Sequence, residues 1–211
     1  MLYNEYLEIG NNMNIDTEHL HYWMCAIRQS NNPMRTLDAF WSGQLKSKEW
    51  LIDCLDEHVH YGSSIDIHGG WVGVLASMIF QSNIPARYIC SVDIDPLCEH
   101  VATMMNKIEE QDGRFKAITG DMCTVPILGD IVINTSCEHI TQEQYESWLD
   151  NVPNDSLIVL QSNDYKIPEH IRTSKTLQEF ESQSHINKLY SGSLKLPLYN
   201  RHMIIGKKCI V

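Results

Sequence analysis

Carboxylates and glycines stand in this chain at positions that can hold a ribose-containing ligand. Asp66 ends a short apolar run, and Gly69, Gly70 and Gly73 follow it before a helical pattern begins. Glycines let the backbone approach a ligand closely, and the first N–H groups of a helix are free to bind polar ligand atoms. Asp93 ends the next apolar run, where a carboxylate of a doubly wound sheet can accept both ribose hydroxyls. The alternative is that the glycines only form a tight turn and let the helix pack closely.

A third landmark is the pair Asp121-Met122, which follows another apolar run. The carboxylate of Asp121 can reach the amino group of an adenine, and Met122 can pack on the ring. Because ligands of open α/β sheets bind outside the carboxyl ends of the strands, these landmarks are expected around one ligand. Asp95 is a weaker candidate, since it can be explained as a helix cap before Pro96.

The segment NTSCEHI is the most polar turn of the chain, and it begins at Asn134 after a fourth apolar run. Asn134 is expected to position the ligand or a second substrate. Glu138 or His139 can act as a general base, because His titrates near neutrality and a half-buried Glu can be raised toward it. Cys137 is either a substrate-contacting nucleophile or a packed thiol, and a structural role for His139 is the alternative to a catalytic one.

Two further groups of residues are candidates for substrate contact. Gln161 and Asn163 lie in the segment QSND, whose other interpretation is an ordinary polar turn. Trp41 and Gln44 lie in the N-terminal part, where Trp41 can equally belong to the core. If the N-terminal helices form a lid, Gln44 and Lys48 can reach a carboxylate of the ligand.

No metal site is predicted from the histidines or the cysteines. The ten histidines show no HExxH spacing. The seven cysteines are odd in number and fit neither a small disulfide scaffold nor paired zinc knuckles. Most of them are therefore interpreted as buried thiols.

Length and charge limit the function classes. The 211 residues suffice for one domain with a full core and at most a small helical extension. No stretch reaches the roughly 20 apolar residues of a membrane span, and the acidic N-terminus does not resemble a secretory signal. We therefore expect a cytoplasmic protein without a membrane partner. The net charge of −11 and the absence of a Lys/Arg stripe argue against a nucleic-acid partner. The sequence leaves the oligomeric state open.

The elements that must position these residues follow from the hydrophobic pattern. Residues 1–60 show apolar residues at helical spacing and are predicted to form a helical extension or lid. From residue 61 on, short apolar runs alternate with helical segments, which is typical of βαβ units. The predicted strands cover residues 64–67, 88–92, 115–118, 131–134 and 157–161, and the predicted helices cover 72–81, 97–110 and 143–151.

The tail predicts a helix over residues 177–188 and then two strands, over 189–196 and 201–211, that form a hairpin at one sheet edge. The predicted fold class is therefore α/β. We expect a doubly wound, mostly parallel seven-stranded sheet with a C-terminal antiparallel hairpin and an N-terminal helical extension.

These landmarks resemble the sequential motifs of the class I S-adenosylmethionine-dependent methyltransferases. The resemblance covers about residues 62 to 211 and includes the terminal hairpin. It departs from the family at His68, which stands where the first glycine of the family's loop is usual. The resemblance implies a Rossmann-like domain over residues 61–211 that binds S-adenosyl-L-methionine. The residues it implies for cofactor binding are Asp66, His68, Gly69, Gly70, Gly73, Asp93, Ile94, Asp121, Met122 and Asn134.

Methyl transfer to a small polar acceptor is the leading functional hypothesis. The turn at Asn134 lacks the prolines and the aromatic residue with which DNA amino-methyltransferases hold a flipped base. An alternative is an enzyme that cleaves or transfers the aminobutyrate arm of the cofactor and releases methylthioadenosine, as a lyase, a cyclase or a nicotianamine synthase-like enzyme. A non-catalytic binder is a third hypothesis. A nicotinamide cofactor also suits such a fold, but Asp121-Met122 and the hairpin favour the sulfonium one.

Overall fold

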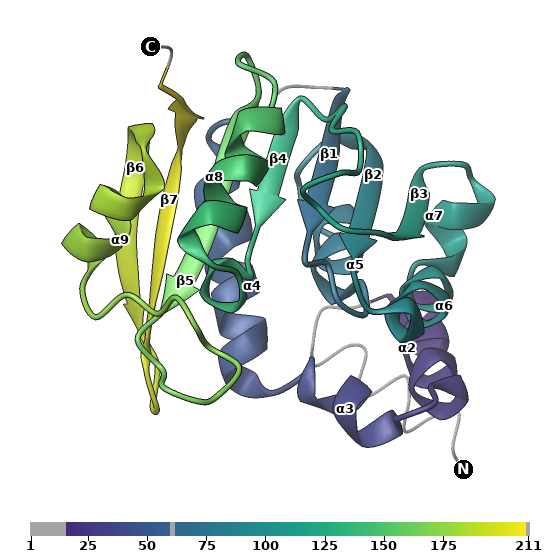
Figure 1. The fold of residues 1–211 in the computed structure, drawn as a ribbon. Helices are drawn as coiled ribbons and strands as arrows, with labels where there is room; N and C mark the ends of the chain where they lie inside the picture. Colours follow the sequence, from purple (N-terminus) through teal and green to yellow (C-terminus); the bar gives the residue numbers. More distant parts are fainter. Residues whose placement is uncertain (1–15, 60–61, 210–211) are drawn as a thin grey trace.

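The computed structural model describes residues 16–59 and 62–209. Their strands form one seven-stranded sheet in the order β3-β2-β1-β4-β5-β7-β6 (Figure 1). The first five strands run parallel, and β7 lies antiparallel between β5 and β6. This confirms the predicted α/β class, the seven-stranded sheet and the terminal hairpin. The strands are β1 (Ser63–His68), β2 (Ala86–Asp93), β3 (Phe115–Thr119), β4 (Ile131–Asn134), β5 (Leu157–Asn163), β6 (Ile186–Lys195) and β7 (Asn200–Lys208).

Helices cover both faces of the sheet because the central strands β1, β4 and β5 are buried along almost their whole length. One face packs against α4 (Ser42–Asp56), α5 (Val74–Phe80) and α6 (Pro96–Met105). The other packs against α8 (Gln142–Asn151) and α9 (Leu177–Ser184). The remaining helices are α2 (Thr17–Gln29), α3 (Pro33–Asp38), α7 (Lys107–Gln111) and the short η1 (Cys137–His139).

The N-terminal helices are joined to the main core rather than standing apart from it. Leu51 and Leu55 of α4 are fully buried against the sheet. Trp23 and Ala26 of α2 pack against α6 in a third apolar cluster. The N-terminal helical part is thus present, while the proposed division at residues 60 and 61 stays a prediction, because that boundary lies outside the described residues. The acidic N-terminus and the end of the predicted strand 201–211 also lie outside the described residues. No described helix is long and apolar enough to span a membrane.

Two predicted helices were wrong in extent. The helix expected over 97–110 is interrupted at Asn106, whose side chain donates to the carbonyls of Gly73 and Ala102 and so ties α6 to the start of α5. The helix expected over 177–188 ends at Ser184, because His185 adopts a left-handed conformation with φ of 51°. Pairing with β7 then continues the chain as strand from Ile186.

Candidate functional site

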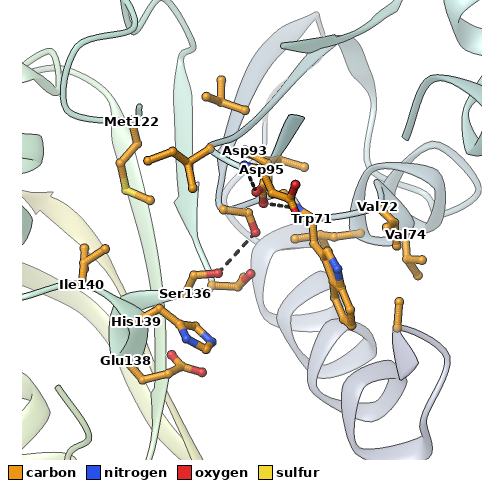
Figure 2. Close-up of a pocket in the computed structure, with 18 of the residues that line it drawn as sticks. Trp71, Val72, Val74, Asp93, Asp95, Met122, Ser136, Glu138, His139 and Ile140 are labelled. Carbon is orange, nitrogen blue, oxygen red and sulfur yellow. Dashed lines mark hydrogen bonds between the residues drawn. The ribbon is translucent and has the colours of Figure 1, made fainter. Parts of the chain in front are cut away.

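A cavity of about 690 Å³ lies at the carboxyl edge of the parallel strands. Its walls come from the turns after β1, β2, β3 and β4, from the loop after β5, and from α3 and α4. Figure 2 shows two facing sides. We call Gly69, Gly70, Asp93 and Ile94 the glycine side, and Glu138, His139, His170 and Arg201 the polar side.

The glycine turn is packed tightly between its neighbouring strands. The N–H of Gly70 donates to the carbonyl of Val92, and a Cβ on Gly70 would lie 2.0 Å from the Ser91 hydroxyl oxygen. Gly69 has φ of 65° and lies beside Ser136, whose hydroxyl donates to the Gly69 carbonyl at 3.3 Å. Both glycines line the cavity. The turn therefore brings backbone to the cavity wall and also contacts the turn after β4.

Gly73 supports the packing interpretation. It begins α5 with φ of 79°, and a Cβ there would lie 2.7 Å from the side-chain nitrogen of Asn106 and 3.0 Å from Ala102. Gly73 does not line the cavity. Its predicted role in cofactor binding is therefore not supported by its position, and close packing of α5 on α6 explains it.

Asp93 lies at the end of β2 and faces the cavity (Figure 2). One carboxylate oxygen accepts from the N–H of Trp71 at 2.8 Å, and the other accepts from the N–H of Asp95 at 3.0 Å. These bonds fix the carboxylate and leave each oxygen further acceptor capacity. Asp95 caps α6 by accepting from the N–H of Leu97 and pairs with Arg35, as expected of a cap.

The turn after β3 supplies the remaining wall beside the glycine side. Asp121 and Met122 both line the cavity, as does Ile94, whose side chain is 71% exposed. An exposed apolar side chain next to a fixed carboxylate suits a flat ring bound above it. The structure thus brings together, around one cavity, six of the residues proposed for cofactor binding: Gly69, Gly70, Asp93, Ile94, Asp121 and Met122.

Asp66 and His68 do not line this cavity. The Asp66 carboxylate accepts from the N–H groups of Leu128 and Gly129 at 2.7 and 2.8 Å, in the loop that leads into β4. His68 is fully buried and accepts a hydrogen bond from the indole of Trp148, and burial lowers its pKa to about 4. Their positions do not support the expected direct cofactor contact, because these side chains are used inside the fold.

Asn134 shapes the turn after β4 rather than lining the cavity. Its side-chain oxygen accepts from the N–H of Ser136 at 2.9 Å, and its amide nitrogen lies 3.5 Å from the sulfur of Met122. It is fully buried. Cys137 is also fully buried, and burial raises the pKa of its thiol to about 12. Full burial and a raised pKa favour the packed interpretation of Cys137 over the nucleophile interpretation.

Glu138 is held by a buried network from distant parts of the chain. One carboxylate oxygen accepts from Asn163 at 2.5 Å and from Arg201 at 2.6 Å. Arg201 also donates to the side chain of Gln161 and to the carbonyl of Thr135. Gln161 and Asn163, proposed as substrate contacts, do not line the cavity and instead hold the residues that do. Their positions favour a role in supporting Glu138 and Arg201 over the expected direct contact with substrate.

His139 and His170 approach each other at the mouth of the polar side. Their ring centroids are 4.7 Å apart. His139 follows β4 and His170 lies in the loop after β5, so the fold joins them although they are distant in sequence. Both line the cavity together with Glu138.

Helix α4 closes the cavity with Gln44 and Lys48. The Lys48 ammonium donates to the side-chain oxygen of Gln44 at 3.1 Å. Burial and, to a smaller extent, the positive charge of Arg201 lower the pKa of Lys48 to about 7. Trp41 does not line the cavity; its ring lies 6.2 Å from that of Tyr199 and is partly exposed. The expected substrate contact of Trp41 is thus not supported by its position.

Comparison with known proteins agrees with this geometry. No family model and no curated protein sequence matches the chain. Among solved structures, magnesium protoporphyrin IX methyltransferase from Synechocystis PCC 6803 with bound SAH is 14% identical and superposes with a TM-score of 0.64. That match covers 90% of this chain and 94% of the other. The chain has the class I methyltransferase fold.

A second structure of this fold covers more of the chain. MtNAS in complex with MTA and tNA is 15% identical, with a TM-score of 0.60, over 98% of this chain and 74% of the other. The pyocyanin biosynthetic protein PhzM is 16% identical with a TM-score of 0.62, over 89% of this chain and 62% of the other. The cavity of our chain lies at the carboxyl edge of the parallel strands, which is where open α/β sheets bind ligands.

Sequence reasoning missed Arg201 and His170. Arg201 stands at the start of an apolar strand, and His170 lies in an irregular loop, so neither carries a local signature. Lys48 was expected to reach a ligand carboxylate, and its place in the cavity wall agrees with that expectation.

Proposed function

We propose that the cavity binds S-adenosylmethionine and that the chain transfers its methyl group to a small polar acceptor on the polar side. The observation that carries this proposal is the fixed carboxylate of Asp93, which faces a large cavity beside the glycine turn. A carboxylate in this position can accept the two hydroxyls of a ribose. The structures of similar fold that hold SAM or SAH support it.

The chemistry of the donors and acceptors fits this cofactor. Asp93 and Asp121 offer carboxylate oxygens for hydroxyl and amino groups, while Ile94 and Met122 offer apolar contacts for the adenine ring. Lys48 offers a half-buried amino group that, when protonated, can pair with the carboxylate of the aminobutyrate arm. When bound, the cofactor supplies an electrophilic methyl group on a sulfonium.

The polar side would orient the acceptor and handle its proton. Arg201 and Asn163 fix Glu138 rigidly, so this carboxylate can position a polar group of the acceptor. His139 is exposed at the cavity and is the better placed of the two to take a proton to solvent. The net charge of −11 supports a small acceptor over a nucleic acid.

A second candidate function uses the aminobutyrate arm of the same cofactor. The match to MtNAS extends over 98% of the chain and so takes in the N-terminal helices, whereas the matches to the two structures of magnesium protoporphyrin IX methyltransferase cover 79% and 90%. The MtNAS structure is a complex with MTA and tNA. Release of methylthioadenosine by our chain is therefore the alternative outcome.

Calorimetry with S-adenosylmethionine, followed by mass analysis of products formed with a metabolite extract, tests both functions. Methyl transfer predicts stoichiometric binding and formation of S-adenosylhomocysteine. Methylthioadenosine in its place would establish the second function. Binding without any product would indicate a non-catalytic binder, and the absence of binding would overturn the cofactor assignment itself.

A further inference from the structure

Three potential metal ligands meet on the polar side of the cavity. Glu138, His139 and His170 each offer one ligand atom, and these atoms all lie within 4.8 Å of one another. Glu138 and His139 come from η1 and His170 from the loop after β5. We propose that these residues hold a divalent transition-metal ion, with Zn²⁺ as the ion that suits them best. The sequence predicted no metal because this set has no characteristic spacing.

Each of the two histidines has one ring nitrogen fixed by a backbone carbonyl. The Nδ1 atom of His139 lies 3.1 Å from the carbonyl oxygen of Glu169, and that of His170 lies 2.7 Å from the carbonyl oxygen of Tyr165. A carbonyl oxygen can only accept, so Nδ1 is the donor in each contact, and in the neutral ring Nε2 is the nitrogen that can bind a metal. Ligating histidines are usually fixed in this way, by a second bond from the other ring nitrogen.

Glu138 supplies the second, independent observation. Its residue is 3% exposed, and Oε1 is bonded to Asn163 and Arg201. Oε2 is buried without a hydrogen-bond partner among the described residues. Leaving a buried carboxylate oxygen unpaired is costly, and a bound cation removes that cost. Figure 2 shows the Glu138 carboxylate beside the His139 ring.

The ligand set favours a particular class of ion. Two imidazoles and one carboxylate suit Zn²⁺ and neighbouring transition metals, whereas Mg²⁺ and Ca²⁺ prefer sites built from oxygen alone. Ligand atoms of a tetrahedral zinc site lie about 3.4 Å apart, so the three side chains would close slightly around the ion. Arg201 repels a cation here, while the Glu169 side chain, which also lines the cavity, attracts it.

Three protein ligands leave one coordination position open toward the cavity, as in catalytic zinc sites. The role of the ion rests on the proposed function, and with the ion bound His139 is a ligand, so the ion takes the place of His139 in handling the acceptor's proton. A bound ion would lower the pKa of an acceptor hydroxyl, whose proton would pass to water. The oxygen lone pair would then form the bond to the methyl carbon while the carbon–sulfur bond of the cofactor breaks, with the electron pair of that bond staying on sulfur.

Metal titration of the EDTA-treated full chain tests the site without any cofactor. Co²⁺ spectroscopy and competition with Zn²⁺ are expected to show one strong site per chain with nitrogen and oxygen ligands. His139→Ala and His170→Ala should each weaken metal binding by at least about 10- to 100-fold. That loss is usual when a residue that only hydrogen-bonds a metal ligand is changed, and loss of the ligand itself should cost no less. His100→Ala, an exposed helical histidine outside the cluster, should bind as the wild type does.

Three results would overturn the proposal: no strong Co²⁺ or Zn²⁺ binding, unchanged binding in both histidine variants, or a thiolate-to-metal absorption band that assigns the ion to cysteines. Circular dichroism identifies any variant that fails to fold, and His139→Asn and His170→Asn then replace the alanine variants. S-adenosylmethionine binding is measured separately on the same samples. Metal binding without cofactor binding would support this site and contradict the proposed function. Cofactor binding without metal binding would support the proposed function and contradict this site.

Discussion

The glycine side and the polar side of the cavity are built by different means. On the glycine side, Asp93 is fixed by backbone N–H groups only a few residues away or on the neighbouring turn. On the polar side, Glu138 is fixed by a buried ion pair with Arg201, which lies 63 residues away in the sequence. The first arrangement is local and partly open to solvent, whereas the second is remote and enclosed.

This difference separates binding from stability. A change at Asp93 removes ligand contacts and leaves the hydrophobic core intact. A change at Glu138 or Arg201 leaves the other charge buried, so it affects folding and the site together. Substitutions on the two sides should therefore be distinguishable by which quantity they alter most.

The largest effect is expected on turnover. Glu138→Gln and His139→Asn should each lower kcat by roughly 10²- to 10⁴-fold, since both remove a group that handles the acceptor, while S-adenosylmethionine affinity stays nearly unchanged. Steady-state kinetics with the identified acceptor and calorimetry with the cofactor provide the two measurements. Wild-type turnover in both variants would remove the pair from the catalytic residues and reduce the polar side to a structural feature.

Stability gives the next largest effect. Arg201→Met leaves the buried Glu138 carboxylate without its cation and should lower the free energy of unfolding by about 3–5 kcal/mol. Arg35→Met is the matched control on the other side of the cavity, because its pair with Asp95 is partly exposed and should contribute about 0–1 kcal/mol. Urea unfolding measures both. Equal losses in the two variants would show that the two sides do not differ in this respect.

The same contrast explains what the sequence could predict. Asp93 ends β2 and Asp121 follows β3 closely, so a local pattern of apolar runs was enough to find them. Arg201 reaches Glu138 because β7 pairs with β5 in the register that sets Arg201 opposite Asn163, and no local pattern encodes that register. The direction in which Asp66 points could not be predicted for a related reason: a carboxylate in a strand looks the same in sequence whether it faces the cavity or, as here, the loop before β4.

On the glycine side, Asp93→Ala should weaken S-adenosylmethionine binding by about 10- to 1,000-fold, because charge-assisted hydrogen bonds to the ribose are lost. The fold should be retained, as checked by thermal unfolding. Asp95→Asn is the control, since it keeps the helix cap and does not belong to the proposed ribose contact. An Asp93→Ala protein that binds the cofactor with wild-type affinity would show that the ribose lies elsewhere.

The smallest effect concerns Lys48, which lies between the two sides. Its pKa in the free protein is about 7, so it is mostly neutral at pH 8. If its ammonium pairs with the cofactor carboxylate, binding raises that pKa and takes up a proton, so affinity is highest below pH 7 and falls above it. Between pH 6 and pH 8 the affinity should drop about tenfold, or roughly 1.4 kcal/mol. Calorimetry at the two pH values measures this change in affinity. Lys48→Met should not show the change. Titration of the cofactor's own amino group affects both proteins equally and so does not explain a difference between them. The same pH dependence in wild type and Lys48→Met would place the carboxylate away from α4.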